Sequence, residues 1–509
     1  MELSPVASVI AVVAVTVATI AIGTFGLRLS RTTSDFYVAG RVVSPGWNAS
    51  AISGEYLSAA SFLGVAGLVL TSGTDMLWFP VGYTAGYLVL LVLVAAPLRR
   101  SGAYTLPDFA EARLESTQVR LAASLLVVGI GWLYLLPQLQ GAGLALRAAT
   151  GAPGWLGGAV VATVVLLNVV AGGMRSITFV QAFQYWLKLT AIAVPVFFLL
   201  LVWHADGSPS PAAAGGPEWI APLSGAGGRD HPLYATYSVI LALFFGTMGL
   251  PHVLVRFYTN PDGRGARRTT VVVIALLGAF YLFPPVYGAL GRVYAPDLLL
   301  SGRADTVVLL LPSRLVPGLP GQLLSALTTA GAFAAFLSTS SGLTMSIAGV
   351  LHQDLRRRRT GSTNPDTLRG FRSATLIAVS VPLALSLTAG SMSLADTVGL
   401  AFAVAASTFC PLLVLGIWWR RLTRWGALAG LAAGGTLASG AVLATMLGAA
   451  GGGWTASLLA QPAAWTVPIA FAVMVMVSLA TPKSLPPNVS RTMVRLHTPE
   501  DVAVDRRLA

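Results

Sequence analysis

Charged residues are scarce in this sequence. Of its 509 residues, 10% are charged and 55% are hydrophobic, and the mean hydropathy is +0.75. In soluble domains roughly a quarter of the residues are charged. The composition therefore excludes an ordinary soluble protein and predicts a polytopic membrane protein. The single cysteine, Cys410, excludes an intrachain disulfide and a cysteine metal cluster. His, Cys and Asp show no metal-ligand spacing and no serine nucleophile motif stands in a suitable context, so we expect a protein that is not an enzyme.

Apolar windows long enough to cross a bilayer recur along the chain. They predict about thirteen transmembrane helices, which start near Pro5, Trp47, Met76, Arg120, Trp155, Ile177, Tyr234, Thr270, Gln322, Arg372, Ser393, Trp425 and Ala464. With the N-terminus outside, most of the 32 basic residues fall in cytoplasmic segments, as the positive-inside rule requires. The net charge of +13 therefore reflects topology, and no nucleic acid is expected as a partner. We expect an all-α, multi-pass protein of the cell (inner) membrane, surrounded by lipid, with a cytoplasmic C-terminus.

The second predicted span contains an unusual polar stretch. It reads Ser53-Gly54-Glu55-Tyr56-Leu57-Ser58-Ala59-Ala60-Ser61-Phe62-Leu63-Gly64. An ionised carboxylate at membrane depth costs several kcal/mol unless it faces protein or water. Glycine and serine weaken a helix, and freed backbone groups persist only in a protein-lined cavity. The stretch therefore predicts a broken helix that binds something small and charged near the midplane. The alternative, a small-residue packing seam, explains Ser58 equally well but gives no reason for Glu55.

A second break is predicted in the seventh span, at Gly246-Thr247-Met248-Gly249-Leu250-Pro251-His252. Pro251 lacks a backbone donor and clashes with the preceding turn, so it should kink or open the helix. Interrupted helices at corresponding places in two halves indicate a transporter site. Five spans separate the two breaks, so spans two to six and seven to eleven would form an inverted repeat. The corresponding segments are 1–46 (first helix and loop), 47–203 (first repeat), 204–232 (outer loop), 233–418 (second repeat), 419–482 (helices twelve and thirteen) and 483–509 (cytoplasmic tail).

The ninth span carries four consecutive hydroxyl residues, from Ser338 to Ser341. The hydroxyls of Ser338 and Thr339 could act as ligands of a hard cation such as sodium, which prefers oxygen ligands. Carbonyls of the broken second helix could supply the other ligands. The alternative is that these hydroxyls bond back to carbonyls of their own helix. Lys188 falls within the sixth span, where we expect it to snorkel to the membrane edge or to pair locally.

The chain resembles the sodium:solute symporter family, and within it the cation/acetate (monocarboxylate) symporter branch. The similarity extends over nearly the whole chain, to about Thr481. The matching stretches are Ser34-Asp35-Phe36-Tyr37-Val38-Ala39-Gly40-Arg41, the segment from Gly54 to Gly64, Leu133-Tyr134-Leu135, Gly141-Ala142-Gly143, the segment from Gly246 to His252, and Leu400-Ala401-Phe402-Ala403. The motif around Glu55 and the Gly-Leu-Pro-His motif are specific to the branch, whereas the Ser-Thr pair is a wider family feature.

The resemblance implies a LeuT-like five-plus-five inverted repeat with broken helices 2 and 7. Carried over by position, it implies a sodium site made of the carbonyls of Ser53, Tyr56 and Ala335 and the hydroxyls of Ser338 and Thr339. Glu55 matches a functional aspartate of the proline-transporting branch, and we expect an ion-coupling role for it. The only cofactor-like species implied is Na⁺ as the coupling ion.

The substrate site is predicted less sharply. Positions that carry polar side chains in sugar-transporting relatives are mostly apolar or small here, which argues against a sugar. A small organic anion could bind amides near Ser58 and Ser61, at the positive end of a half-helix. Tyr134, Gln138 and Thr247 are candidate side-chain contacts; ordinary interhelical hydrogen bonding is the alternative.

His252 is expected to be a hydrogen-bonded histidine near the inner vestibule, with titration during transport as the alternative. The sequence as a whole predicts sodium-coupled uptake of a short monocarboxylate such as acetate by alternating access. A proton-coupled carrier of the same fold, or a sodium symporter for another small solute such as an amino acid, remains open.

Overall fold

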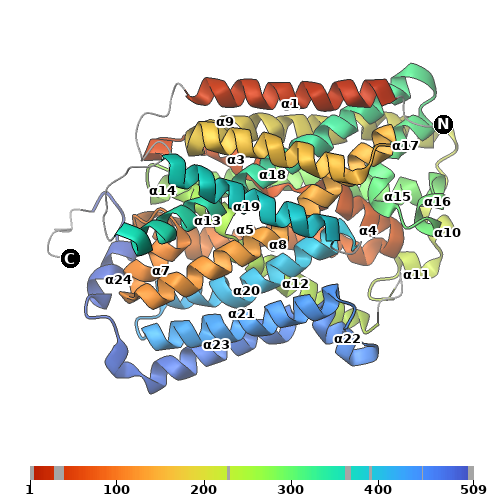
Figure 1. Ribbon diagram of the computed structural model, residues 1–509. Helices are drawn as coiled ribbons and strands as arrows, with labels where there is room; N and C mark the ends of the chain where they lie inside the picture. Colours follow the sequence, from red (N-terminus) through yellow and green to blue (C-terminus); the bar gives the residue numbers. More distant parts are fainter. Residues whose placement is uncertain are drawn as a thin grey trace.

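The protein is a bundle of helices that run mostly along one direction (Figure 1). The computed structural model describes residues 5–27, 39–225, 230–360, 368–388, 392–449 and 451–502, and these residues contain helices and no strand. The α-helices are α1 (Pro5–Leu27), α3 (Pro45–Tyr56), α4 (Val65–Ser72), α5 (Trp78–Val89), α6 (Ala95–Arg100), α7 (Leu106–Leu114), α8 (Thr117–Thr150), α9 (Gly154–Ala205), α10 (Pro211–Gly215), α11 (Pro217–Ile220), α12 (Pro232–Gly249), α13 (Pro251–Phe257), α14 (Gly263–Tyr281), α15 (Pro284–Tyr294), α16 (Asp297–Leu300), α17 (Val307–Leu315), α18 (Gly318–Thr360), α19 (Leu368–Thr388), α20 (Leu394–Trp418), α21 (Arg424–Met446), α22 (Gly453–Ala460), α23 (Ala463–Ala480) and α24 (Val489–His497). Most of the predicted Ser34–Arg41 motif lies outside the described residues.

Eleven helices in the described part of the chain are long and apolar enough to cross a membrane. The stretch Ala60–Arg100 counts once among them, although the chain turns within it at Gly73, whose φ is 72°. Arg41 precedes α3 and Gly102 follows α6, and Arg41 Nη2 donates to the Gly102 carbonyl over 2.8 Å. The segment from α3 to α6 therefore begins and ends at the same end of the bundle. Gly154–Val170 is a shorter apolar helix. The predicted number of about thirteen is reached when the two parts of Ala60–Arg100 are counted separately and Gly154–Val170 is added. The all-α membrane architecture is confirmed.

Both predicted helix breaks are present. Helix α3 ends at Tyr56, Leu57 has non-helical backbone angles (φ −72°, ψ 89°), and the chain resumes as a π-helical turn, Ala60–Gly64, that leads into α4. Helix α12 ends at Gly249, Leu250 is extended (φ −75°, ψ 115°), and α13 begins with Pro251. A proline fits the first helical position because its missing N–H would have no helical partner there. The positions of the breaks agree with the sequence prediction.

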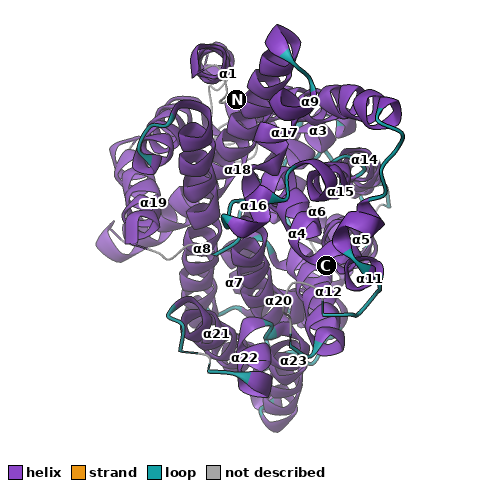
Figure 2. Ribbon diagram, turned by 90° about the vertical axis from the view of Figure 1, so that its right-hand side faces the viewer, coloured by secondary structure: helices purple, strands orange, loops and turns teal. Residues whose placement is uncertain are grey.

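Helices α18 and α20 form the interior of the bundle. The apolar windows of α18 and α20 are 83% and 89% buried, whereas that of α1 is 28% buried. Helix α18 packs against α9, α8, α3 and α1, and the end-on view shows it surrounded by other helices, with α1 at the periphery (Figure 2). The hydroxyl residues of α18 therefore lie on one of the two most enclosed spans of the described part.

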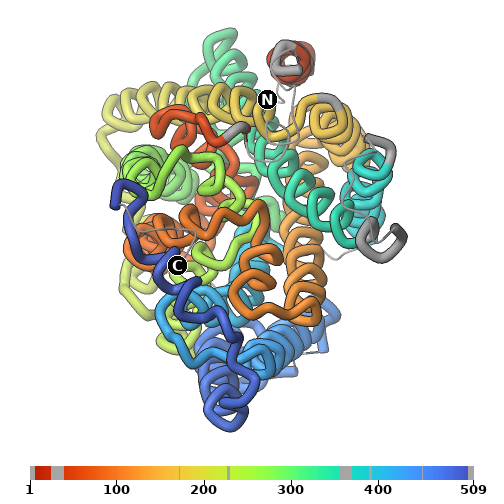
Figure 3. The backbone as a smooth tube through the Cα atoms, turned by 90° about the vertical axis from the view of Figure 1, so that its left-hand side faces the viewer, coloured from red at the N-terminus to blue at the C-terminus, as the bar shows by residue number. Residues whose placement is uncertain are grey.

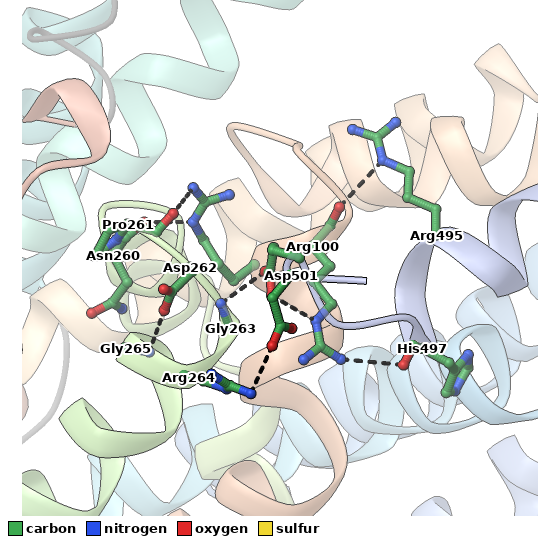
Figure 4. A network of polar contacts seen from close by, with 12 residues as sticks. Arg100, Asn260, Pro261, Asp262, Gly263, Arg264, Gly265, Arg495, His497 and Asp501 are labelled. Carbon is green, nitrogen blue, oxygen red and sulfur yellow. Dashed lines mark hydrogen bonds and ion pairs between the residues drawn. The ribbon is translucent and has the colours of Figure 1, made fainter. Parts of the chain in front are cut away.

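The C-terminal segment covers one end of the bundle (Figure 3), which we call the α24 end. Glu500 accepts hydrogen bonds from Arg100 Nε, over 3.3 Å, and from the amide of Gly263, over 2.8 Å. Arg264 forms an ion pair with Asp501 (Figure 4). Residues 483–509 were predicted only as a cytoplasmic tail, whereas the structure contains α24, which buries Met493 and Leu496. Residues 503–509 lie outside the described part.

We expect a pH-dependent stability from Asp305, which lies in a short helix between α16 and α17. Burial raises the pKa of the Asp305 carboxyl to about 6, and repulsion by Asp396 adds to this rise. A hydrogen bond from the Leu394 amide lowers the pKa and offsets part of the rise. Between about pH 4 and pH 6 the folded state keeps a proton that the unfolded state releases, so stability falls as the pH rises through this window. The free energy of unfolding should fall by about 2 kcal/mol over this window. This is less than the energy that corresponds to the full pKa difference, because Asp305 is partly exposed.

The measurement is thermal unfolding in detergent across this pH range for the wild type and Asp305→Asn. The melting temperature of the wild type should fall relative to that of the variant as the pH rises from 4 to 7. A difference between the two that does not change with pH would contradict this assignment.

Candidate functional site

The break in the second span lies against the hydroxyl residues of α18. Thr339 Oγ1 donates to the carbonyl of Glu55 over 2.6 Å. Ser338 Oγ donates to the carbonyl of Ala335 in its own helix over 3.0 Å. Both hydroxyl residues are fully buried. The structure therefore places four of the predicted sodium-site and coupling residues, Glu55, Ala335, Ser338 and Thr339, in one polar cluster.

The carbonyls of the break are arranged differently from the prediction. The carbonyl of Ser53 accepts the helical hydrogen bond of Leu57 N–H, over 3.1 Å. Besides the Glu55 carbonyl, the carbonyls of Gly54 and Leu57 accept side-chain hydrogen bonds, and each is one residue away from the predicted Ser53 and Tyr56. That Ser53, Tyr56 and Ala335 ligate sodium stays a prediction.

Lys188, on α9, supplies the cation that these oxygens contact. Its Nζ donates to the carbonyl of Gly54, to the carbonyl of Leu57 over 2.8 Å, and to Ser338 Oγ over 2.8 Å. The side chain is fully buried, so it does not snorkel to the membrane edge. An ammonium group has three N–H donors, and each finds an oxygen acceptor here.

A buried ion pair connects the two broken helices. Glu55 Oε2, on α3, accepts a hydrogen bond from Arg256 Nε, on α13, over 2.7 Å, and the two side chains are 2% and 1% exposed. Arg256 also donates to Thr178 Oγ1, over 2.7 Å, and to Gln181 Oε1. Gln181 Nε2 in turn donates to the carbonyl of Ser338, over 2.8 Å. The pair is thus embedded in a continuous polar network that reaches the hydroxyl residues of α18.

Sequence reasoning missed Arg256, Gln181 and the role of Lys188. Arg256 stands in the short apolar helix α13. Lys188 and Arg256 are basic residues within otherwise apolar helices, and an ionisable group at membrane depth is a signal of function by default. That signal was applied to Glu55 only.

Three of the predicted substrate contacts make hydrogen bonds across the helix break. Gln138 Oε1, on α8, accepts from the amide of Ala59 over 2.9 Å and so caps the second half-helix. Ser61 Oγ and the Tyr281 hydroxyl are 2.8 Å apart. Thr247 Oγ1 lies 2.8 Å from the Tyr56 hydroxyl. These contacts match the alternative of interhelical hydrogen bonding, and they place the three residues beside the break.

Several polar groups near the two breaks have no hydrogen-bond partner among the described residues. They are the hydroxyls of Ser58, Tyr83 and Tyr87 and both ring nitrogens of His252. All four residues are nearly fully buried. The hydrogen bond expected for His252 is not present among the described residues. Buried polar groups are normally paired, so a cluster of unpaired donors is typical of a site that receives a polar ligand.

Aromatic rings form the walls around these groups. The ring of Tyr56 lies 5.0 Å from that of Tyr87, and the ring of Tyr83 lies 5.2 Å from that of Phe402. Tyr134, the remaining predicted substrate contact, packs edge-on against His252 at 5.3 Å. Small-molecule sites are commonly apolar or aromatic, with a few polar groups that orient the ligand. Unpaired polar groups and aromatic rings thus lie together in one buried region beside the breaks.

We expect the protein to lose stability when one partner of the Glu55–Arg256 pair is removed. Arg256→Met leaves the Glu55 carboxylate buried without its partner, and breaking such a pair costs about 3–5 kcal/mol. The double variant Glu55→Gln/Arg256→Met removes both charges and should regain most of the loss. Thermal unfolding of the purified protein measures both effects.

The control is Arg264→Met. It breaks the Arg264–Asp501 pair, whose side chains are 70% and 57% exposed, and exposed pairs contribute about 1 kcal/mol or less. A double variant as unstable as Arg256→Met alone would contradict the proposed role of the buried pair.

Comparisons with known proteins bear on this arrangement. The model of the sodium:solute symporter family matches residues 36–434. The chain is 33% identical over 430 residues to the uncharacterized symporter YwcA of Bacillus subtilis (strain 168), covering 81% of this chain and 82% of that protein.

Among solved structures, a Na⁺-coupled sialic acid symporter superposes with a TM-score of 0.69 at 16% identity and covers 94% of this chain and 97% of its own. Mhp1, a nucleobase-cation-symport-1 family transporter, superposes with a TM-score of 0.54 at 15% identity, covering 91% and 99%. At these identities the structures show the fold alone, and they confirm the LeuT-like architecture. The family match confirms that the chain is a transporter rather than an enzyme. The chain belongs to the sodium:solute symporter family.

Proposed function

We propose that the protein couples inward sodium movement to the uptake of a short monocarboxylate, such as acetate, by alternating access around the two helix breaks. The observation that carries the proposal is the set of ionisable side chains in the buried cluster. Its ionisable side chains are Arg256, Lys188 and Glu55, so in their ionised forms two cations face one carboxylate. A buried excess of positive charge is costly, and a monovalent anion at the breaks offsets it.

The unpaired donors support an anionic solute. A carboxylate has only acceptor oxygens, and the hydroxyls of Ser58, Tyr83 and Tyr87 are able to donate to it. The aromatic rings of Tyr56, Tyr83 and Phe402 lie close together, which favours a solute with a short apolar part over a sugar.

Sodium fits the oxygen atoms at the break. The hydroxyls of Ser338 and Thr339 and the carbonyls around Gly54 and Leu57 are neutral oxygen ligands of the kind that hard cations prefer. A bound sodium ion and a bound carboxylate attract each other, so the binding of each should strengthen the binding of the other. We propose Glu55 as the coupling residue because it holds Arg256 of the second broken helix and its carbonyl meets Thr339.

The distribution of basic residues supports the proposed orientation. Arg41, Arg99, Arg100 and Arg264 lie near the α24 end. The positive-inside rule then makes the α24 end cytoplasmic, which puts the C-terminus inside the cell. For an inner-membrane protein, uptake then proceeds toward this end.

The direct experiment is uptake of labelled acetate into proteoliposomes with sodium and proton gradients imposed separately. The proposal expects accumulation driven by the sodium gradient and inhibited by propionate, lactate or pyruvate, whereas the neutral isostere acetamide has no effect. Accumulation driven by protons alone would assign the carrier to proton coupling. Competition by an amino acid but by no monocarboxylate would assign it another solute.

The sodium site predicts a second result. The double variant Ser338→Ala/Thr339→Ala should need at least about tenfold more sodium for half-maximal uptake, which corresponds to about 1.4 kcal/mol of binding free energy. Thr328→Ala is the matched control, since its hydroxyl lies on the same helix and donates to the Ser325 carbonyl of that helix. Unchanged sodium dependence in the double variant would remove the ion site from these residues.

A further inference from the structure

The amino group of Lys188 contacts oxygen atoms at the C-terminal end of α3 and on α18. The three acceptors are the carbonyls of Gly54 and Leu57 and the hydroxyl of Ser338. Lys188 itself comes from α9, which packs against both α3 and α18. A cation carried by the protein is therefore held by oxygen atoms of the kind that a sodium ion would need.

These contacts are specific to an unhydrated cation. The carbonyls of Gly54 and Leu57 are freed because the helix opens at Leu57, and a buried carbonyl without a partner is unfavourable. Ser338 Oγ donates its own proton to the Ala335 carbonyl, over 3.0 Å, so it presents a lone pair to Lys188. The geometry satisfies all three donors of an ammonium group at once.

A sodium ion and the Lys188 ammonium compete for the same oxygens. Two cations on one set of ligands repel strongly in a site that excludes water. Each oxygen that Lys188 holds is also a ligand lost to sodium. The carboxylate of Glu55 is already engaged by Arg256 over 2.7 Å, and this engagement limits its capacity to neutralise a second cation beside Lys188.

We propose that the Lys188 ammonium and a sodium ion are mutually exclusive occupants of the oxygen cage formed by Gly54, Leu57 and Ser338. This inference rests on the proposed sodium coupling and adds a regulating part to that site. Sodium binds only when Lys188 leaves the cage, so Lys188 sets the sodium affinity. When sodium is released, Lys188 returns and keeps the opened backbone satisfied, which stabilises the empty carrier while it reorients.

The first test is direct binding of radioactive sodium to the purified protein by a scintillation proximity assay, with no carboxylate present. Lys188→Met keeps the length of the side chain and removes the competing charge, so the Kd for sodium should fall at least about tenfold. Lys483→Met is the matched control because Lys483 is the other lysine of the sequence and lies in a short helix outside the spans. Its sodium affinity should equal that of the wild type. Equal or weaker sodium binding by Lys188→Met would overturn the inference.

A second measurement keeps Lys188 intact. In the Lys483→Met background Lys188 is the single lysine, and reductive methylation followed by peptide mass spectrometry reports its accessibility. Sodium chloride should raise the labelling of Lys188 at least severalfold relative to choline chloride at the same ionic strength. Labelling that is the same in both salts, with sodium bound, would overturn the exchange.

The two proposals fail in different ways. Wild type that binds sodium but accumulates no monocarboxylate would contradict the proposed substrate and leave the Lys188 exchange supported by its own binding data. Wild type that accumulates acetate with sodium, together with unchanged sodium binding in Lys188→Met, would contradict the exchange alone. Sodium binding by neither protein would overturn both the exchange and the sodium coupling.

Discussion

A helix that opens inside a membrane leaves backbone groups that lipid cannot satisfy, and side chains from distant helices satisfy them in this protein. Lys188 holds the carbonyls of Gly54 and Leu57, Thr339 holds the carbonyl of Glu55, and Gln138 caps the amide of Ala59. The opened backbone of the second span can exist only because α8, α9 and α18 surround it. The polar site and the enclosed position of α18 in the bundle are therefore consequences of one constraint.

The same constraint ties the two broken helices to each other. Glu55 stands just before the first break and Arg256 just after the second, and their ion pair is fully enclosed. Close packing is needed for this contact: an added Cβ at Gly342, on α18, would collide with the Glu55 carboxylate. A rearrangement of one half-helix therefore alters the charge environment of the other. Such a connection is what alternating access around a central site requires.

The fold was largely predictable from the sequence, because hydropathy and helix-breaking residues act locally. Apolar windows located the spans, and Pro251 and the glycines and serines around Glu55 located both breaks. The turn at Gly73 within Ala60–Arg100 and the kink at Gly173 (φ 59°) match the predicted starts of separate spans. The π-helical turn at Ala60–Gly64 and the amphipathic α24 were not predicted, since each spans few residues and depends on neighbouring helices.

The site was predictable only in part. Polar residues in apolar spans can be recognised in the sequence, as Glu55, Ser338 and Thr339 were. Their partners, however, lie far away along the chain. Lys188 is 134 residues from Gly54, and Arg256 is 201 residues from Glu55. Which carbonyl of the break faces inward depends on backbone angles at Leu57 that no residue type dictates. Sequence patterns therefore identified the polar segments, while the pairing between them required the structure.

In the proposed mechanism, sodium and the monocarboxylate bind as one coupled unit at the helix breaks. The most direct test measures the Kd for sodium with and without saturating acetate, and the Kd for acetate with and without saturating sodium, on the same purified protein. Each ligand should lower the Kd of the other by the same factor, because coupling free energies are reciprocal. Two affinities that are independent of each other would contradict a shared site.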